Sequence, residues 1–277
     1  MRRTIQTIAL ALTATLILAA CGSEEVVDPP DDSVDGPLIQ VSSEGGFVPV
    51  EFQIARGPTF TLTRDKQFIF PGFTTLEYPG PLIPAVFSSD LTDEQYERIV
   101  ELIEEMGIED MEDEADDSVT NVADASTEVI EYWDQNGVHR YSVYALGVDD
   151  RPAPAATEAF EELFTYLHGL TGTVDGTPYD AVLYRVVASP SYAEQDPTFI
   201  DIRPWPLDGE DPHDWIELTT VGEQTWTCQA FGPEAIGPFE DATQATLWMD
   251  PSESGDAQNI QLLVRPLHPG EEDCSLE

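Results

Sequence analysis

The carboxylates best suited to metal chemistry gather in one short segment. Acidic residues are dense between positions 109 and 117. They are Glu109, Asp110, Glu112, Asp113, Glu114, Asp116 and Asp117. Calcium takes roughly six to eight oxygen ligands, which such a segment can supply, but the central glycine and ligand spacing of an EF-hand loop are missing. We therefore expect a solvated acidic loop and no cofactor, with a weak calcium site as the alternative.

Cys228 and Cys274 are the pair of thiols that could react with each other. They lack the CxxC spacing of a metal or redox site, so a structural disulfide is the better prediction. In the chain-entropy description, closing this loop would stabilise the folded chain by about 4 kcal/mol.

Motifs of nucleophilic, zinc-dependent and nucleotide-dependent catalysis are missing from the sequence, which contains no GxSxG, HExxH, GxGxxG or Walker loop. The histidines have no metal-ligand spacing and are expected on the surface or in strands. They are His139, His168, His213 and His268. A hydrolase that acts on wall polymers through paired carboxylates stays an alternative, but chance alone supplies many such pairs among 54 acidic residues.

The net charge restricts the partners. The chain has 54 acidic and 11 basic residues, a formal charge of −43. A surface this negative repels nucleic acid and anionic polymers, so no nucleic-acid partner is expected.

Apolar periodicity predicts the elements that would carry these groups. Alternation over residues 48–56 and 59–64 predicts strands, and the proline-rich stretch 71–84 excludes a helix there. A helix should begin at Thr92, where Gln95 completes a capping box, and end at Gly107.

The next predicted unit repeats this order. Strands 127–135 and 138–146 flank Asn136-Gly137, a dipeptide typical of a type I′ hairpin, and a helix over 155–168 should stop at Gly169. The predicted fold class is α+β. An antiparallel sheet would carry two amphipathic helices on one face, in the order strands, helix, strands, helix.

The chain divides into four predicted segments: a signal at 1–20, a disordered acidic tether at 21–45, the α+β domain at 46–171 and a mostly β part at 172–277 with the one disulfide. The last part has weak strand patterns at 181–188, 199–203, 215–220, 246–249 and 260–266. Whether it extends the first sheet or folds separately stays open.

The N-terminus has the features of an export signal: Arg2 and Arg3 precede an apolar run that ends in Leu18-Ala19-Ala20-Cys21. This ending resembles the lipobox of bacterial lipoproteins. The resemblance implies that the Cys21 thiol receives a diacylglyceryl group and that cleavage occurs just before it. Two acyl chains anchor a protein stably, so we expect it on the outer face of the cell membrane.

The chain as a whole resembles uncharacterised acidic lipoproteins of high-GC Gram-positive bacteria. The segments that carry this resemblance are 46–50 (GFVPV), 142–147 (SVYALG) and 265–270 (RPLHPG). It implies no activity. The sequence therefore predicts a non-enzymatic envelope lipoprotein that binds a protein or a small ligand, with the wall hydrolase and a calcium-dependent module as alternatives.

Overall fold

The computed structural model describes residue 34 and residues 36–73, 78–119, 121–148, 152–191, 201–221, 224–252 and 259–274. The predicted signal, Cys21 and most of the predicted tether lie outside these residues. None of the helices in the described ranges combines the length and apolar character that spanning a bilayer requires.

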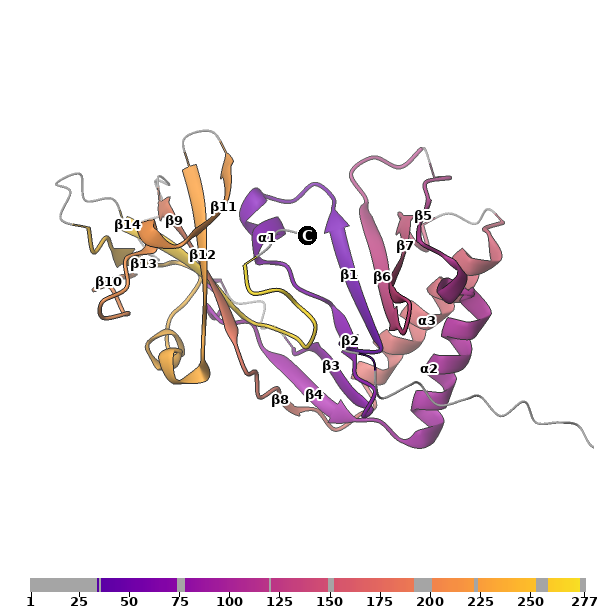
Figure 1. Cartoon of the computed structure of the whole chain (residues 1–277). Coiled ribbons are helices and arrows are strands. Elements are labelled where there is room, and N and C mark those ends of the chain that lie inside the picture. The colour runs from indigo at the N-terminus through magenta and orange to yellow at the C-terminus, as the bar shows by residue number, and fades with distance from the viewer. Residues whose placement is uncertain are drawn as a thin grey trace, which may run out of the picture.

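Two β-sheets lie side by side, and the helices α2 (Asp93–Met106) and α3 (Ala155–Thr171) cover the face of the first sheet that points away from the second (Figure 1). The first sheet has eight strands. In spatial order these are β5 (Asp113–Asp116), β7 (Gly137–Tyr144), β6 (Ser126–Asp134), β1 (Ile39–Gly45), β2 (Phe60–Leu62), β3 (Gln67–Pro71), β4 (Val86–Asp90) and β8 (Thr177–Pro178).

The first sheet is mixed, whereas an antiparallel sheet was predicted. β6 and β7 form the predicted hairpin, and β5 pairs with the outer side of β7. In the chain β5 comes before β6, but it pairs with β7 and not with β6, and it runs parallel to β7. The hairpin turn also differs from type I′, since Gly137 has a positive φ of 132° but neither Gln135 nor Asn136 does.

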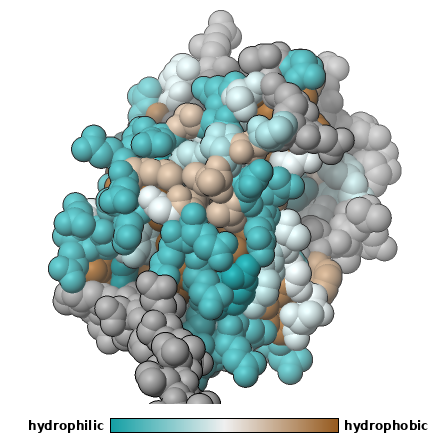
Figure 2. All heavy atoms as spheres, turned by 90° about the vertical axis from the view of Figure 1, so that its right-hand side faces the viewer, coloured by the Kyte–Doolittle hydropathy of each residue, from teal (hydrophilic) through white to brown (hydrophobic). Residues whose placement is uncertain are grey.

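The helices α2 (Asp93–Met106) and α3 (Ala155–Thr171) share one apolar core with the sheet. Thr92 and Gln95 form the predicted capping box, and Gly107 ends α2 with a φ of 69°. α3 continues through Gly169 and is capped by Gly172 in a right-handed conformation, so the predicted stop at Gly169 is wrong. The outer face of these helices is mostly hydrophilic (Figure 2).

The third helix, α1 (Val50–Ala55), occupies the segment in which a strand was predicted. Six residues are too few to separate a period of 2 from one of 3.6. Pro49, with a φ of −55°, begins the helix. The predicted order of strands, helix, strands, helix is therefore wrong, because a short helix also follows the first strand.

β1 lies inside the predicted tether. Ile39 and Val41 point into the helix-covered core, and Gln40 is 4% exposed on the other face. Because β1 pairs with β2 on one side and β6 on the other, it is a central strand, and the folded region begins before residue 46.

The C-terminal part forms its own six-stranded sheet. The order is β10 (Asp201–Arg203), β13 (Thr246–Met249), β14 (Asn259–Pro266), β9 (Tyr184–Ser191), β12 (Gln224–Phe231) and β11 (Ile216–Val221). It is also mixed, since β10 and β13 are parallel. The boundary predicted at residue 172 is too early, because β8 at Thr177–Pro178 still pairs with β4 of the first sheet.

Residues 267–274, the C-terminal strap, join the two sheets. Gln40 Nε2 on β1 donates to the Pro269 carbonyl at 2.9 Å, and Thr61 Oγ1 on β2 lies 2.9 Å from His268 Nδ1. The predicted disulfide between Cys228 and Cys274 is confirmed, with a Cα–Cα distance of 5.7 Å. One end of the strap is therefore covalently attached to β12 of the second sheet.

Candidate functional site

The acidic segment that sequence analysis singled out is not a loop. Glu109 and Asp110 lie in a 3₁₀ turn, and residues 113–116 form the edge strand β5. Successive side chains of a strand point to opposite faces, which separates the carboxylate of Asp113 from those of Glu114 and Asp116. Asp116 points inward and accepts hydrogen bonds from Thr157 Oγ1 at 2.7 Å and Ser118 N at 3.0 Å.

Glu112 and Asp117 flank this strand and are exposed. Within the described ranges, no three His, Cys, Asp or Glu side chains are grouped so that they could hold one metal ion.

His268 is buried in the strap, although surface or strand positions were predicted for the histidines. Burial lowers the pKa of its imidazole to about 4, and the neighbouring Arg265 acts in the same direction while Glu271 opposes it. At neutral pH the ring is therefore uncharged and holds the strap to β2 through Thr61.

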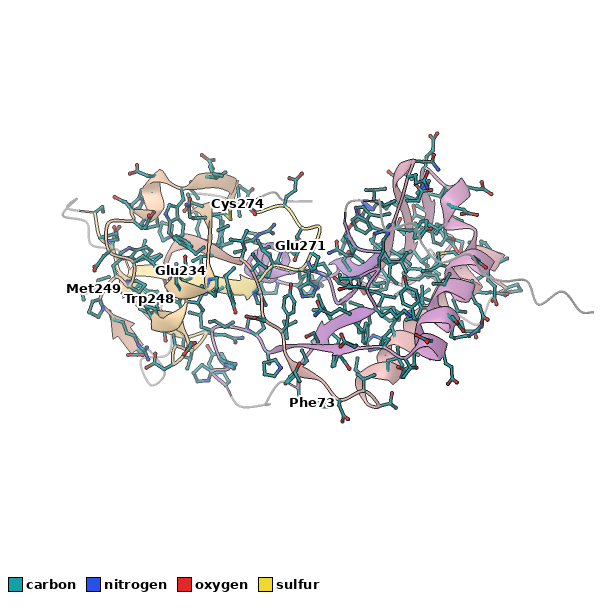
Figure 3. The ribbon with its side chains drawn as sticks, turned by 60° about the horizontal axis from the view of Figure 1, so that its bottom comes forward. Phe73, Glu234, Trp248, Met249, Glu271 and Cys274 are labelled. Carbon is teal, nitrogen blue, oxygen red and sulfur yellow. A yellow bond between two sulfur atoms is a disulfide. The ribbon has the colours of Figure 1, made fainter. Side chains whose placement is uncertain are left out.

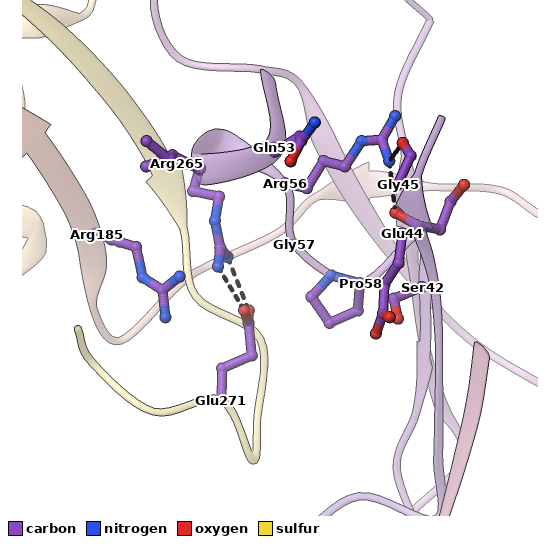
Figure 4. Close-up of a pocket in the computed structure, with 12 residues that line it drawn as sticks. Ser42, Glu44, Gly45, Gln53, Arg56, Gly57, Pro58, Arg185, Arg265 and Glu271 are labelled. Atoms are coloured by element: carbon purple, nitrogen blue, oxygen red, sulfur yellow. Dashed lines mark hydrogen bonds and ion pairs between the residues drawn. The ribbon is translucent and has the colours of Figure 1, made fainter. Parts of the chain in front are cut away.

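A pocket of about 280 Å³ lies at the junction of the two sheets. We call it the junction pocket. β1, the segment from α1 to β2, β9, β14 and the C-terminal strap all contribute to its wall (Figure 4). Its lining residues are Ser42, Ser43, Glu44, Gly45, Gln53, Ile54, Arg56, Gly57, Pro58, Arg185, Arg265 and Glu271.

Arg265 and Glu271 form a buried ion pair in one wall of the pocket. Arg265 Nη2 lies 2.6 Å from Glu271 Oε1 and Nη1 lies 2.9 Å from Oε2, so the pair is bidentate. Their side chains are only 9% and 4% exposed. The backbone N–H of His268 donates to Glu271 Oε2 at 2.7 Å. Figure 3 shows Glu271 between the two sheets.

Gly57 permits this arrangement. A Cβ at residue 57 would lie 2.6 Å from Arg265 Nη1, closer than real Cβ contacts. The glycine therefore lets the guanidinium of one sheet approach the backbone of the other.

The other two arginines of the pocket bind backbone carbonyls. Arg185 Nε donates to the Asp273 carbonyl at 2.9 Å and Nη2 to that of Glu272 at 2.6 Å. Arg56 Nη1 donates to the carbonyls of Ser43 at 2.9 Å and Gly45 at 3.0 Å. These bonds fix both guanidiniums, so the pocket is pre-organised by its own backbone.

Sequence analysis missed this site, because its arginines come from three distant segments. A signal was nevertheless present. Arg185 lies inside the apolar strand pattern at 181–188, and Arg265 directly follows the apolar residues of the pattern at 260–266, in a chain with only 11 basic residues. A buried charge needs a partner or a ligand, so a basic residue within or next to an apolar strand pattern indicates a functional or structural site.

Comparison of this chain with models of protein families, with curated proteins and with solved structures found no match.

Proposed function

We propose that this chain is a lipid-anchored protein of the cell envelope that binds a small ligand in the junction pocket without transforming it. The lipobox at Leu18-Ala19-Ala20-Cys21 supports the anchor. The Cys228–Cys274 disulfide supports an oxidising compartment, because such bonds are rare in the cytosol.

The observation that carries the binding function is the position of the pocket. Ligand sites form preferentially where two structural units meet, because each unit supplies a rigid wall. Here β1 supplies one wall and β9 and β14 the other, and the arginines between them are held by hydrogen bonds. Less side-chain entropy is then lost when a ligand binds.

Fractionation of cells tests the anchor. Cys21→Ala should move the protein from the membrane fraction to the soluble fraction, because the acylated thiol is lost. Cys274→Ser removes a different cysteine and should leave the protein in the membrane fraction. Equal membrane retention of Cys21→Ala and the unaltered protein would refute the anchor.

Thermal-shift screening of the purified full chain with neutral, cationic and anionic small molecules tests the pocket. Gln53→Trp, at an exposed position in the pocket lining, should abolish the shift produced by any true ligand. Gln135→Trp makes the same replacement at the exposed β6–β7 turn and should preserve the shift. Shifts that Gln53→Trp leaves unchanged would place binding elsewhere and contradict the proposal.

A further inference from the structure

We propose that the junction pocket recognises an oxyanion, the carboxylate or phosphate group of a small ligand. This deepens the proposed function and rests on it, because it names the chemistry that the same pocket would bind.

The charges in the lining differ from those of the whole chain. The lining contains Arg56, Arg185 and Arg265 against two glutamates, whereas the chain has 11 basic and 54 acidic residues. If basic residues were as frequent in the lining as in the whole chain, a lining of this size would contain fewer than one of them. A protein this acidic repels anions over most of its surface. Concentrating arginines in one hollow is therefore what an anion site requires here.

Both glutamates of the lining are engaged with arginines. Glu271 is held by Arg265, and Glu44 Oε1 lies 2.6 Å from Arg140 Nη2 on β7, outside the lining. The charge of Glu44 is thus shared with an arginine beyond the pocket. The lining as a whole carries more arginines than carboxylates, which favours an incoming anion.

Arg56 offers the N–H groups that a ligand would meet. Within the described residues its hydrogen bonds all use Nη1, and no carboxylate there forms an ion pair with it. Nε and Nη2 are left for a ligand. A planar guanidinium matches the two oxygens of a carboxylate or a phosphate face, and such charge-assisted bonds are about twice as strong as neutral ones.

The size of the pocket limits the ligand. A volume of about 280 Å³ is near the lower end of known ligand sites, roughly 300–1,000 Å³. The part of the ligand that enters the pocket is therefore of small-molecule size.

Isothermal titration of the purified full chain at fixed ionic strength tests the inference, with inorganic phosphate and acetate as separate probes. At least one should bind, and Arg56→Gln should weaken that binding tenfold or more, because one charge-assisted contact is lost. Arg98→Gln removes the same charge from the surface of α2 and should leave the affinity unchanged. Circular dichroism checks the fold of each variant, and Gln53→Trp replaces Arg56→Gln if the latter does not fold.

The probes also separate the possible ligands. Binding of phosphate alone would indicate a phosphate-bearing ligand, and binding of acetate alone a carboxylate. Equal weakening by Arg56→Gln and Arg98→Gln would overturn the inference, as would binding of neither probe. If neither probe binds but a neutral or cationic compound gives a thermal shift that Gln53→Trp abolishes, the binding function stands and the oxyanion specificity fails.

Discussion

Glu271→Gln should destabilise the protein strongly while hardly changing the shape of the side chain. The carboxylate of Glu271 accepts two hydrogen bonds from Arg265 and one from the backbone N–H of His268. Both partners of the ion pair are almost fully buried, with 9% and 4% of their side chains exposed. The substitution leaves the Arg265 charge buried without its counterion.

Breaking a buried ion pair in this way costs about 3–5 kcal/mol. Since roughly 1 kcal/mol shifts the Tm of a protein of this size by about 2–4 °C, the melting temperature should fall on the order of 10 °C. Thermal unfolding followed by circular dichroism at pH 7, with the disulfide intact, measures the change.

Glu162→Gln is the matched control. Glu162 pairs with Arg98 between α3 and α2, but their side chains are 60% and 34% exposed. Solvent screens such a pair, so its loss should change the free energy of unfolding by less than about 1 kcal/mol. The double variant Arg265→Met with Glu271→Leu should recover much of the lost stability, because neither charge of this pair is then left buried without the other. If Glu271→Gln and Glu162→Gln lowered the melting temperature by similar amounts, the buried ion pair would not be a special contributor to stability.

Three other substitutions probe single features. Cys274→Ser should lower the free energy of unfolding by about 4 kcal/mol in urea titrations. Reductant should lower the free energy of unfolding of the unaltered protein to the value of the variant. If neither the substitution nor the reductant has an effect, the disulfide does not stabilise the fold. Burial lowers the pKa of His268 to about 4 from 6.5, so its neutral form contributes stability above pH 6.5 that is lost as the pH falls toward 4. Between pH 7 and pH 4.5 the free energy of unfolding should therefore fall by about 2–3 kcal/mol more in the unaltered protein than in His268→Gln, as measured from melting curves. Equal decreases in the two proteins would argue against a buried neutral ring. Thr92→Ala should cost about 1 kcal/mol by removing the capping box of α2, with Thr92→Ser close to the unaltered protein in the same melts.

Elements with strong local signals were predictable from the sequence. α2 has a capping box, a long apolar period and a glycine at its end, and all three appear in the structure. The β6–β7 hairpin and the disulfide were predicted for the same reason, because a short turn and a single pair of thiols leave few alternatives.

Elements defined by distant partners were not predictable. β1 has the alternation of a strand at Ile39 and Val41, but the acidic, proline-containing segment before it obscured the pattern. β12 was missed although it lies between β9 and β11, because the polar residues Thr225, Thr227 and Gln229 surround its two buried side chains, Trp226 and Cys228. The junction pocket depends on which strands become neighbours, and a single sequence does not specify that.

The C-terminal strap makes the order of synthesis matter. Ribosomes produce residues 267–274 after all the strands of both sheets, yet these residues connect β1 and β2, made early, to the second sheet. β9 can pair with β14, along eight residues, only after β14 has been made. Cys228 can likewise form its disulfide only after Cys274 has been made. A nascent chain can complete the helix-covered sheet while its later half is still being made, but the contacts that the strap makes across the junction form only after residues 267–274 have been made. Truncation before residue 267, by a premature stop codon or by a protease, would therefore keep every strand of both sheets but remove the hydrogen bonds of the strap and the disulfide.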